Sequence, residues 1–322
     1  MKRIWSIVFC TAIAFALPAH AQDAAYPKGP VKMIVPFPPG GPTDLLGRIL
    51  SQKLQEIWAH PVVIEYKPGA GTVIGVDAVA KSAADGYTIG LVNSAYTINP
   101  VLLPSMPYNT VRDLANITQV VNMTMALVVN PQAPFSNVQE MVAFAKRNPG
   151  KLTYATPGAG GAAHLAGELL NRAAGIDLVH VPYKGSSPAQ TDVVGGRVDL
   201  MIDPLFSALP FIRSGKMKVV ALAAERRVPG FEQYPVIAEN YSGVTVSAML
   251  GLVVPAATPR GVINRIHADV AKALDTANER KRIAELGMDV AVTPPEQFDA
   301  FVKSEMAKWG KVIREAKIQP PQ

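Results

Sequence analysis

The chain has 322 residues, of which 49% are hydrophobic and 17% are charged, and its formal net charge is +6. This size and apolar content are sufficient for a large core and favour two domains. The positive charges form no basic run, which argues against nucleic-acid binding. The small excess is consistent with ordinary solubility or with a slight preference for anionic solutes.

The first 21 residues are organised like a secretory signal peptide. Two basic residues precede an apolar stretch from Ile4 to Leu17, and Ala19-His20-Ala21 forms a small-residue cleavage site. An uncleaved membrane anchor is the alternative, but the apolar run is too short, because a span needs about 18 apolar residues or more. We therefore expect residues 1–21 to be removed on export by cleavage after Ala21.

Strands and helices alternate in the first part of the mature chain, which is typical of parallel sheets covered by helices on both faces. The stretch Val31–Leu50 predicts a strand, a Pro/Gly loop and an amphipathic helix. After a strand that follows this helix, a second Gly-rich turn at 67–72 precedes a helix at 76–81, and the strand 87–92 ends at Asn93-Ser94. This β-α-β-α-β unit has the size of one lobe.

Two long β-rich runs, Ile117–Asn130 and Val244–Pro255, flank a second alternating region that starts with a helix capped by Ser136 and Gln139. The two runs predict crossovers, so the first lobe is discontinuous. We expect lobe 1 to comprise residues 22–124 with 250–322, and lobe 2 to comprise residues 125–249. The last helix carries Trp309 on an apolar stripe that we expect to pack inward.

The Pro/Gly loop before the first helix recurs in the second lobe. Gly40-Gly41 corresponds to Gly160-Gly161, and Asp44 corresponds to His164. Such a junction presents backbone N–H groups and the positive end of the helix dipole, and small anions bind there readily. Sharp turns without a ligand are the alternative, but two copies in matching register favour an anion site shared by the two lobes.

Neither glycine junction contains a basic residue. No Lys or Arg occurs in 33–47 or in 152–171. An anion between the junctions would therefore be held by backbone N–H groups, hydroxyls such as those of Thr43 and Thr156, and bridging waters. Lys67 and Lys184 are the nearest basic residues, and we expect them to act only through longer-range, screened attraction.

Several polar residues lie where a strand or loop meets the expected crevice. Asp44 is expected to cap its helix or orient water, because a carboxylate would repel an anionic ligand. For His164 the sequence leaves two interpretations open, donation to an anion or a local bond at the helix start. Asn93, Ser94 and Asp203 follow strands whose carboxyl ends should face the crevice, although Asp203 could instead cap the next helix.

Motifs for catalysis or cofactor binding are missing from the sequence. There is no G-x-S-x-G elbow, and the only cysteine, Cys10, lies in the leader with no lipobox before it. The histidines have no metal-ligand spacing, and neither glycine loop matches a nucleotide-binding motif. We therefore expect no catalytic residue, metal or cofactor, and an enzyme stays a minority interpretation.

Several segments carry a close resemblance to one family. The segments YPKGPVKMIVPFPPGGPTD, KPGAGT, AADGYT, GAGGAAHLAGELL, VHVPYKGSSPA and EMAKWGKVI are similar to those of the Bug or TctC-like family, the periplasmic solute-binding receptors of tripartite tricarboxylate transporters. The resemblance implies an α/β, two-lobed periplasmic-binding-protein fold, type II-like and often compared to a Venus flytrap. Each lobe would be a mostly parallel sheet flanked by helices, and two crossover strands would join the lobes.

The resemblance also implies where the ligand binds. A carboxylate would be gripped, partly through ordered waters, by the loops 37–44 and 156–164. The second loop reads Thr156-Pro157-Gly158-Ala159 where the family often has serines, so backbone and water would do more of the binding there. The ligand-binding residues that we expect are Phe37, Pro38, Gly40, Gly41, Thr43, Asp44, Asn93, Ser94, Thr156, Ala159, Gly160, Gly161, His164 and Asp203.

The function that the resemblance implies is capture of a small organic acid in the periplasm. The acid would be a mono-, di- or tricarboxylate, or an aromatic acid such as terephthalate, and it would pass to the integral-membrane permease subunits of the transporter. A receptor that reports to a sensor kinase is the competing interpretation. We expect a monomer that binds no nucleic acid.

Overall fold

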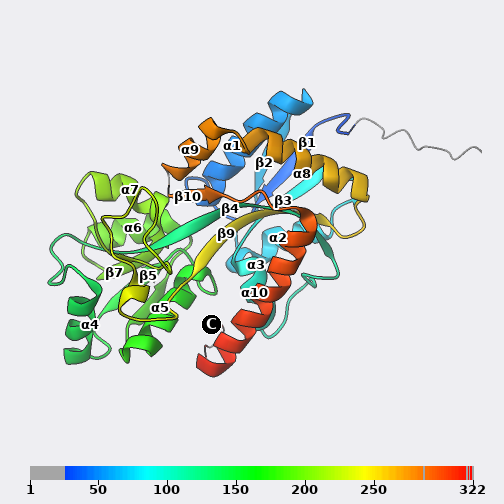
Figure 1. Ribbon diagram of the computed structural model, residues 1–322. Helices are drawn as coiled ribbons and strands as arrows, with labels where there is room; N and C mark the ends of the chain where they lie inside the picture. The colour runs from blue at the N-terminus through cyan, green and yellow to red at the C-terminus, as the bar shows by residue number, and fades with distance from the viewer. Residues whose placement is uncertain (1–25, 286, 317, 319, 321–322) are drawn as a thin grey trace, which may run out of the picture.

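The computed structural model describes residues 26–322 except 286, 317, 319, 321 and 322 (Figure 1). The predicted leader and its cleavage site after Ala21 lie outside the described residues. No helix in the part of the chain that is described has the length and apolar character needed to cross a bilayer.

The first lobe is built on β1 (Val31–Val35), β2 (Val62–Tyr66) and β3 (Thr88–Asn93), which are parallel in the order β2-β1-β3. Next to β3 lies β9 (Ser247–Pro255), which runs antiparallel to it. Beyond β9, β4 (Leu114–Val129) and the short β10 (Met288–Val290) extend the sheet with antiparallel pairs.

The second lobe has the same plan. Its parallel strands are β5 (Thr153–Thr156), β6 (Val179–Pro182) and β7 (Leu200–Pro204), in the order β7-β5-β6. The last residues of β4, from Met125 onward, pair antiparallel with β7 and with β8 (Lys218–Leu222). Strand β4 therefore belongs to both sheets and, with β9, runs between the lobes (Figure 1).

The two-lobed α/β fold is confirmed, with one correction. The sheets are mixed rather than mostly parallel, because the crossover strands β4 and β9 form only antiparallel pairs. Within each lobe, only the strands linked by helices are parallel. The lobe limits stay a prediction.

Helices cover the sheets of both lobes (Figure 1). The long α10 packs against α3 and β4, and Trp309 on it is 1% exposed, which confirms the predicted packing face.

The predicted cap of α4 was wrong by one residue, because Asn137 accepts the Glu140 N–H at 2.9 Å while the Glu140 side chain accepts the Ser136 N–H. The helices are α1 (Pro42–Trp58), α2 (Val73–Ala80), α3 (Ala95–Leu102), α4 (Val138–Arg147), α5 (Ala162–Ala174), α6 (Ser186–Val194), α7 (Leu205–Arg213), α8 (Arg260–Leu274), α9 (Ala277–Ala284) and α10 (Pro295–Ala316), with 3-10 turns at Ala70–Thr72 and Ile237–Glu239.

Candidate ligand-binding site

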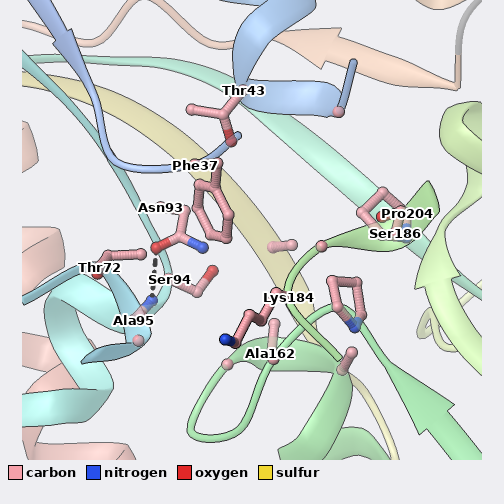
Figure 2. A pocket seen from close by; sticks show the side chains of 18 of the residues that line it. Phe37, Thr43, Thr72, Asn93, Ser94, Ala95, Ala162, Lys184, Ser186 and Pro204 are labelled. Carbon is pink, nitrogen blue, oxygen red and sulfur yellow. Dashed lines mark hydrogen bonds between the residues drawn. The ribbon is translucent and has the colours of Figure 1, made fainter. Parts of the chain in front are cut away.

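A cavity of about 150 Å³ lies between the lobes, against the crossover strands (Figure 2). A single water needs roughly 10–15 Å³ by the same measure, so the cavity has room for about ten atoms the size of a water. That is the size of a small organic molecule. Its lining comprises residues 37–39, 41, 43, 71, 72, 93–95, 123, 125, 157–159, 161–163, 184–188, 204, 248 and 250.

Helices from both lobes begin at this cavity. In the first lobe they are α1, α2 and α3, and in the second lobe they are α5, α6 and α7. The N-cap residues of all six line the cavity, namely Gly41, Thr72, Ser94, Gly161, Gly185 and Pro204. The first N–H groups of a helix have no partner inside it, and the dipole makes this end positive. The cavity is therefore surrounded by positive helix ends.

The N-termini of α1 and α5 have matching geometry. Gly41 has φ −98° and ψ −177°, and Gly161 has φ −93° and ψ 176°. The first bonds join the Leu45 N–H to the Gly41 carbonyl at 3.0 Å and the Leu165 N–H to the Gly161 carbonyl at 3.1 Å. The N–H groups just ahead of these bonds, such as those of Thr43 and Ala163, are thus outside the helical pattern. The predicted equivalence of the two junctions is confirmed.

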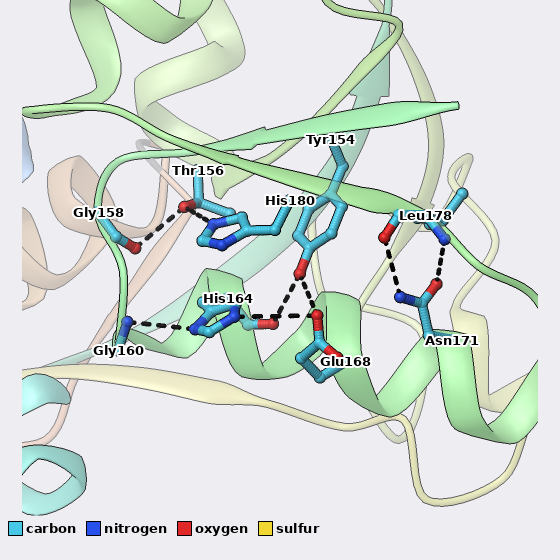
Figure 3. Close-up of polar contacts among 9 residues, drawn as sticks. All are labelled: Tyr154, Thr156, Gly158, Gly160, His164, Glu168, Asn171, Leu178 and His180. Atoms are coloured by element: carbon cyan, nitrogen blue, oxygen red, sulfur yellow. Dashed lines mark hydrogen bonds and ion pairs between the residues drawn. The ribbon is translucent and has the colours of Figure 1, made fainter. Parts of the chain in front are cut away.

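Each loop is held by the fourth residue after a glycine. The Gly40 N–H donates to Asp44 Oδ2 at 2.9 Å, and the Gly160 N–H donates to His164 Nδ1 at 3.2 Å (Figure 3). Both glycines have left-handed backbones, with φ +94° and +75°. None of these four residues lines the cavity. In this structure they shape the loops, and their direct contact with ligand stays a prediction.

The Asp44 carboxylate accepts hydrogen bonds from side chains as well as from the Gly40 N–H. It accepts hydrogen bonds from the Tyr66 hydroxyl at 2.5 Å and from the Arg48 guanidinium at 2.9 Å. Burial would raise the pKa of Asp44, but these bonds and the Gly40 N–H outweigh it and lower the pKa. The carboxylate is therefore charged and lies in the first turn of α1, at the positive end of the helix. It accepts the N–H of Gly40, which precedes the N-cap residue, and α1 has no side-chain cap, so the expected capping bond is not found.

His164 belongs to a stacked aromatic cluster behind the second loop (Figure 3). Its ring lies 4.0 Å from that of His180, which in turn stacks on Tyr154 at 4.9 Å. Burial lowers the pKa of His164 to about 4. The neutral ring accepts the Gly160 N–H, so of the two interpretations the local bond is the one found. Thr156 is also fully buried behind the cavity wall. Its hydroxyl donates to the Gly158 carbonyl and is hydrogen-bonded to His180 Nε2.

Asp203 is fully buried and does not line the cavity. Its carboxylate accepts from the Ser186 hydroxyl at 2.6 Å and from the Gln190 amide at 2.7 Å. Burial raises the pKa of Asp203 to about 6, against the lowering effect of these hydrogen bonds. The expectation that it faces the crevice was wrong. It fixes Ser186, which does line the cavity.

The other predicted residues are brought together on the cavity wall. Asn93 Oδ1 accepts the Ala95 N–H at 3.1 Å, and Ser94 Oγ accepts the Met249 N–H at 3.1 Å. The Asn93 amide N–H groups and the Ser94 O–H are then left as donors (Figure 2). Contact of this set with ligand stays a prediction; it comprises Phe37, Pro38, Gly41, Thr43, Asn93, Ser94, Ala159 and Gly161.

Several lining residues were missed in the site predicted from sequence, including Ala95 and Pro204, which follow predicted residues directly. Gly71 and Thr72 come from the turn at 67–72, whose glycines were a usable signal. Residues 184–188 follow β6, and the rule that ligands meet strand ends would have found them. The crossover strands add four apolar side chains, for which the sequence has no local signal.

Lys184 is the one charged side chain among the lining residues. It is exposed at the cavity and, within the described chain, its ammonium has no ion pair or hydrogen bond to the protein. Lys67 does not line the cavity and pairs with Glu65 at 2.9 Å. Among the described residues no cluster of His, Cys, Asp or Glu is arranged to hold a metal ion.

A two-lobed α/β fold with two crossover strands and a cavity between the lobes is the fold of the periplasmic solute-binding proteins of the Venus-flytrap class. The particular family follows from the sequence, since the model of the tripartite tricarboxylate transporter family receptor matches residues 46–318. The chain belongs to this family.

Known proteins agree with this assignment. The chain is 34% identical to BugT of Bordetella pertussis over 320 residues, which is 98% of each chain. The structure titled "R. palustris Rpa4515 with adipate" is 29% identical, with a TM-score of 0.89, and the match covers 92% of this chain and all of that one. MatC (Rpa3494) from Rhodopseudomonas palustris with bound malate is 30% identical, with a TM-score of 0.84, over 89% of this chain and all of that one.

Proposed function

We propose that this receptor binds a small organic carboxylate in the cavity between its lobes. The observation that carries the proposal is the set of six helix N-termini at the cavity wall. A carboxylate only accepts hydrogen bonds, and the N–H groups ahead of the first bonds of α1 and α5 supply donors. No lining side chain is acidic, so no negatively charged side chain on the described wall repels an anion.

The residues facing the ligand would act mainly through the backbone. Gly41 and Gly161 carry no side chain, and a Cβ at either position would meet no atom within 4 Å. Solute or bridging water can therefore reach the main chain. Asn93 and Ser94 add side-chain donors, and Lys184 adds a positive charge at the exposed side of the cavity.

The ligand class is supported by the relatives. Rpa4515 was crystallised with adipate and MatC with malate, both dicarboxylates. A mono-, di- or tricarboxylate, or an aromatic acid, would satisfy the donors of the loops 37–44 and 156–164. The family and the solved neighbours are solute-binding proteins, and binding without conversion is part of the proposal.

Export and delivery complete the proposal. After cleavage behind Ala21, the monomeric receptor would capture its acid in the periplasm and deliver it to the integral-membrane permease subunits of a tripartite tricarboxylate transporter. The family description names this transporter. Reporting to a sensor kinase is the alternative use of the same binding event, and the genes that neighbour this one would distinguish transport from sensing.

A thermal-shift screen of the mature protein against organic acids tests the proposal. A true ligand stabilises the folded state by mass action, so the melting temperature should rise with its concentration. The best acid is then incubated with the protein and recovered by chromatography. The acid should be returned unchanged and bind one per protein; multiple-turnover product, or stabilisation only by non-acids, would contradict the receptor function.

A further inference from the structure

The crossover strands form an apolar floor under the cavity. Met123 and Met125 project from β4, and Ala248 and Leu250 project from β9. Met123 is the cross-strand partner of Ala248, so the four side chains form one continuous stripe. They are 5%, 2%, 4% and 0% exposed, respectively. We call these four residues the floor.

The polar groups around the floor include many donors and no carboxylate, and the hydroxyl oxygens among them belong to other elements than the floor. The helix N-termini present N–H groups, and Asn93 and Ser94 have already used their side-chain oxygens to accept backbone N–H groups. The Ser186 O–H donates to Asp203 Oδ1 at 2.6 Å. The carboxylates of Asp44 and Asp203 lie outside the lining and are bonded within their own lobes.

This arrangement is unfavourable for a polar substituent on the body of the ligand. A hydroxyl group there would face carbon and sulfur atoms of the floor and lose its bonds to water. Burying such a group without a partner costs enough to weaken binding by about tenfold or more. An ammonium group would be worse, because no acidic side chain among the lining residues can pair with it.

We infer that the floor makes this receptor selective for carboxylates with an unsubstituted hydrocarbon body, against hydroxy and amino acids of the same length. The inference rests on the proposed function, since it places the carboxylate at the N-termini of α1 and α5 and the carbon chain on the floor. Phe37, half-buried at the cavity, adds a further apolar surface (Figure 2).

Calorimetry on the unmodified protein with matched acids tests the inference. One set is succinate, malate and aspartate, and the second is adipate, 3-hydroxyadipate and 3-aminoadipate. In at least one set the unsubstituted acid should bind, the hydroxy acid about tenfold more weakly, and the amino acid about a hundredfold more weakly. Equal or tighter binding of the substituted acids would overturn the selectivity while leaving the proposed function intact. No binding of any organic acid would overturn both.

Substitution of Met125 tests whether the floor causes the selectivity. Met125 is preferred to Met123 because Met123 also lines a second cavity. Met125→Gln keeps the size but adds an amide, so the ratio between the hydroxy acid and the unsubstituted acid should shrink toward one. Met125→Leu, the apolar control, should keep the ratio near tenfold. An unchanged ratio in folded Met125→Gln would overturn the role of the floor. If that variant does not fold, the ratios of the unmodified protein still decide the selectivity.

Discussion

Gly41 and Gly161 are the residues at which binding can be tested without disturbing the fold. Both have extended backbones that any residue can adopt, so neither position requires glycine for its backbone conformation. A side chain there would project into open space at the cavity wall. Gly41→Val or Gly161→Val should therefore block access to the helix N-terminus and weaken ligand binding by about tenfold to a hundredfold, with unchanged circular dichroism.

Lys184 provides the comparison for the two glycines. Because its ammonium is exposed, its attraction for an anion is screened by salt. Lys184→Ala should weaken binding less than either glycine variant, and the loss should fall as salt rises. Lys67→Ala, whose side chain is outside the lining, should have little effect. Loss of binding in Lys184→Ala, together with normal binding by both valine variants, would show that the site is a charge clamp.

The buried His164 should make the free energy of unfolding depend on pH. Burial lowers its pKa in the folded protein to about 4, although Glu168 lies 3.8 Å away and favours the charged ring. Unfolded histidine has a pKa of about 6.5. Between these values the unfolded state binds the extra proton, so His164 contributes stability above pH 6.5 that is lost as the pH falls toward 4.

The expected loss is on the order of 1 kcal/mol per pH unit in this window. Asp203 changes stability in the opposite direction, since its raised pKa of about 6 favours the folded state as the pH falls. The measurement therefore compares the pH dependence of stability in the unmodified protein with that in a His164 variant. His164→Asn keeps an acceptor for the Gly160 N–H but does not titrate, and urea unfolding should show a smaller loss from pH 6.5 to 4.5 in the variant. Identical profiles would show that His164 is not held neutral by the fold.

At the scale of elements, the two glycine junctions differ in what surrounds them. Gly40 and Gly160 both have left-handed backbones, but a Cβ at Gly40 meets no atom within 4 Å, whereas one at Gly160 would lie 3.1 Å from Leu102 Cδ2. Gly40→Ala should cost about 1–2 kcal/mol of unfolding free energy from backbone strain alone. Gly160→Ala should cost more, because Leu102 must also move. Urea unfolding of both, with Gly41→Ala as an unstrained control, tests this order.

The elements were largely predictable from sequence because their signals are local. Glycines and β-branched runs marked both strand-to-helix junctions, and the two long β runs marked the crossovers. The orientation of single side chains was not predictable. Asp203 follows a strand as expected, yet Ser186 and Gln190, which come from α6, hold it behind the wall. Met125 looks like any other strand residue until β7 and β9 are placed beside β4.

At the scale of the whole molecule, the lobes meet across the edge of the cavity. A Cβ on Gly71 of the first lobe would lie 3.6 Å from the Ala159 carbonyl of the second. Strand β4 belongs to both sheets and β9 pairs alongside it, so we expect these two strands to act as the hinge. A ligand that contacts both lobes should shift the population toward the closed form. Small-angle scattering should show a smaller radius of gyration with saturating ligand; an unchanged radius would contradict hinge closure.

The central claim is that helix N-termini from both lobes bind the carboxylate group itself. Calorimetry of the best acid from the screen against its neutral primary amide tests this most directly, because the amide keeps the shape but removes the negative charge. The acid should bind one per protein and the amide about a hundredfold more weakly or not at all. Equal affinity for the acid and the amide would show that the positive helix ends do not determine what this cavity binds.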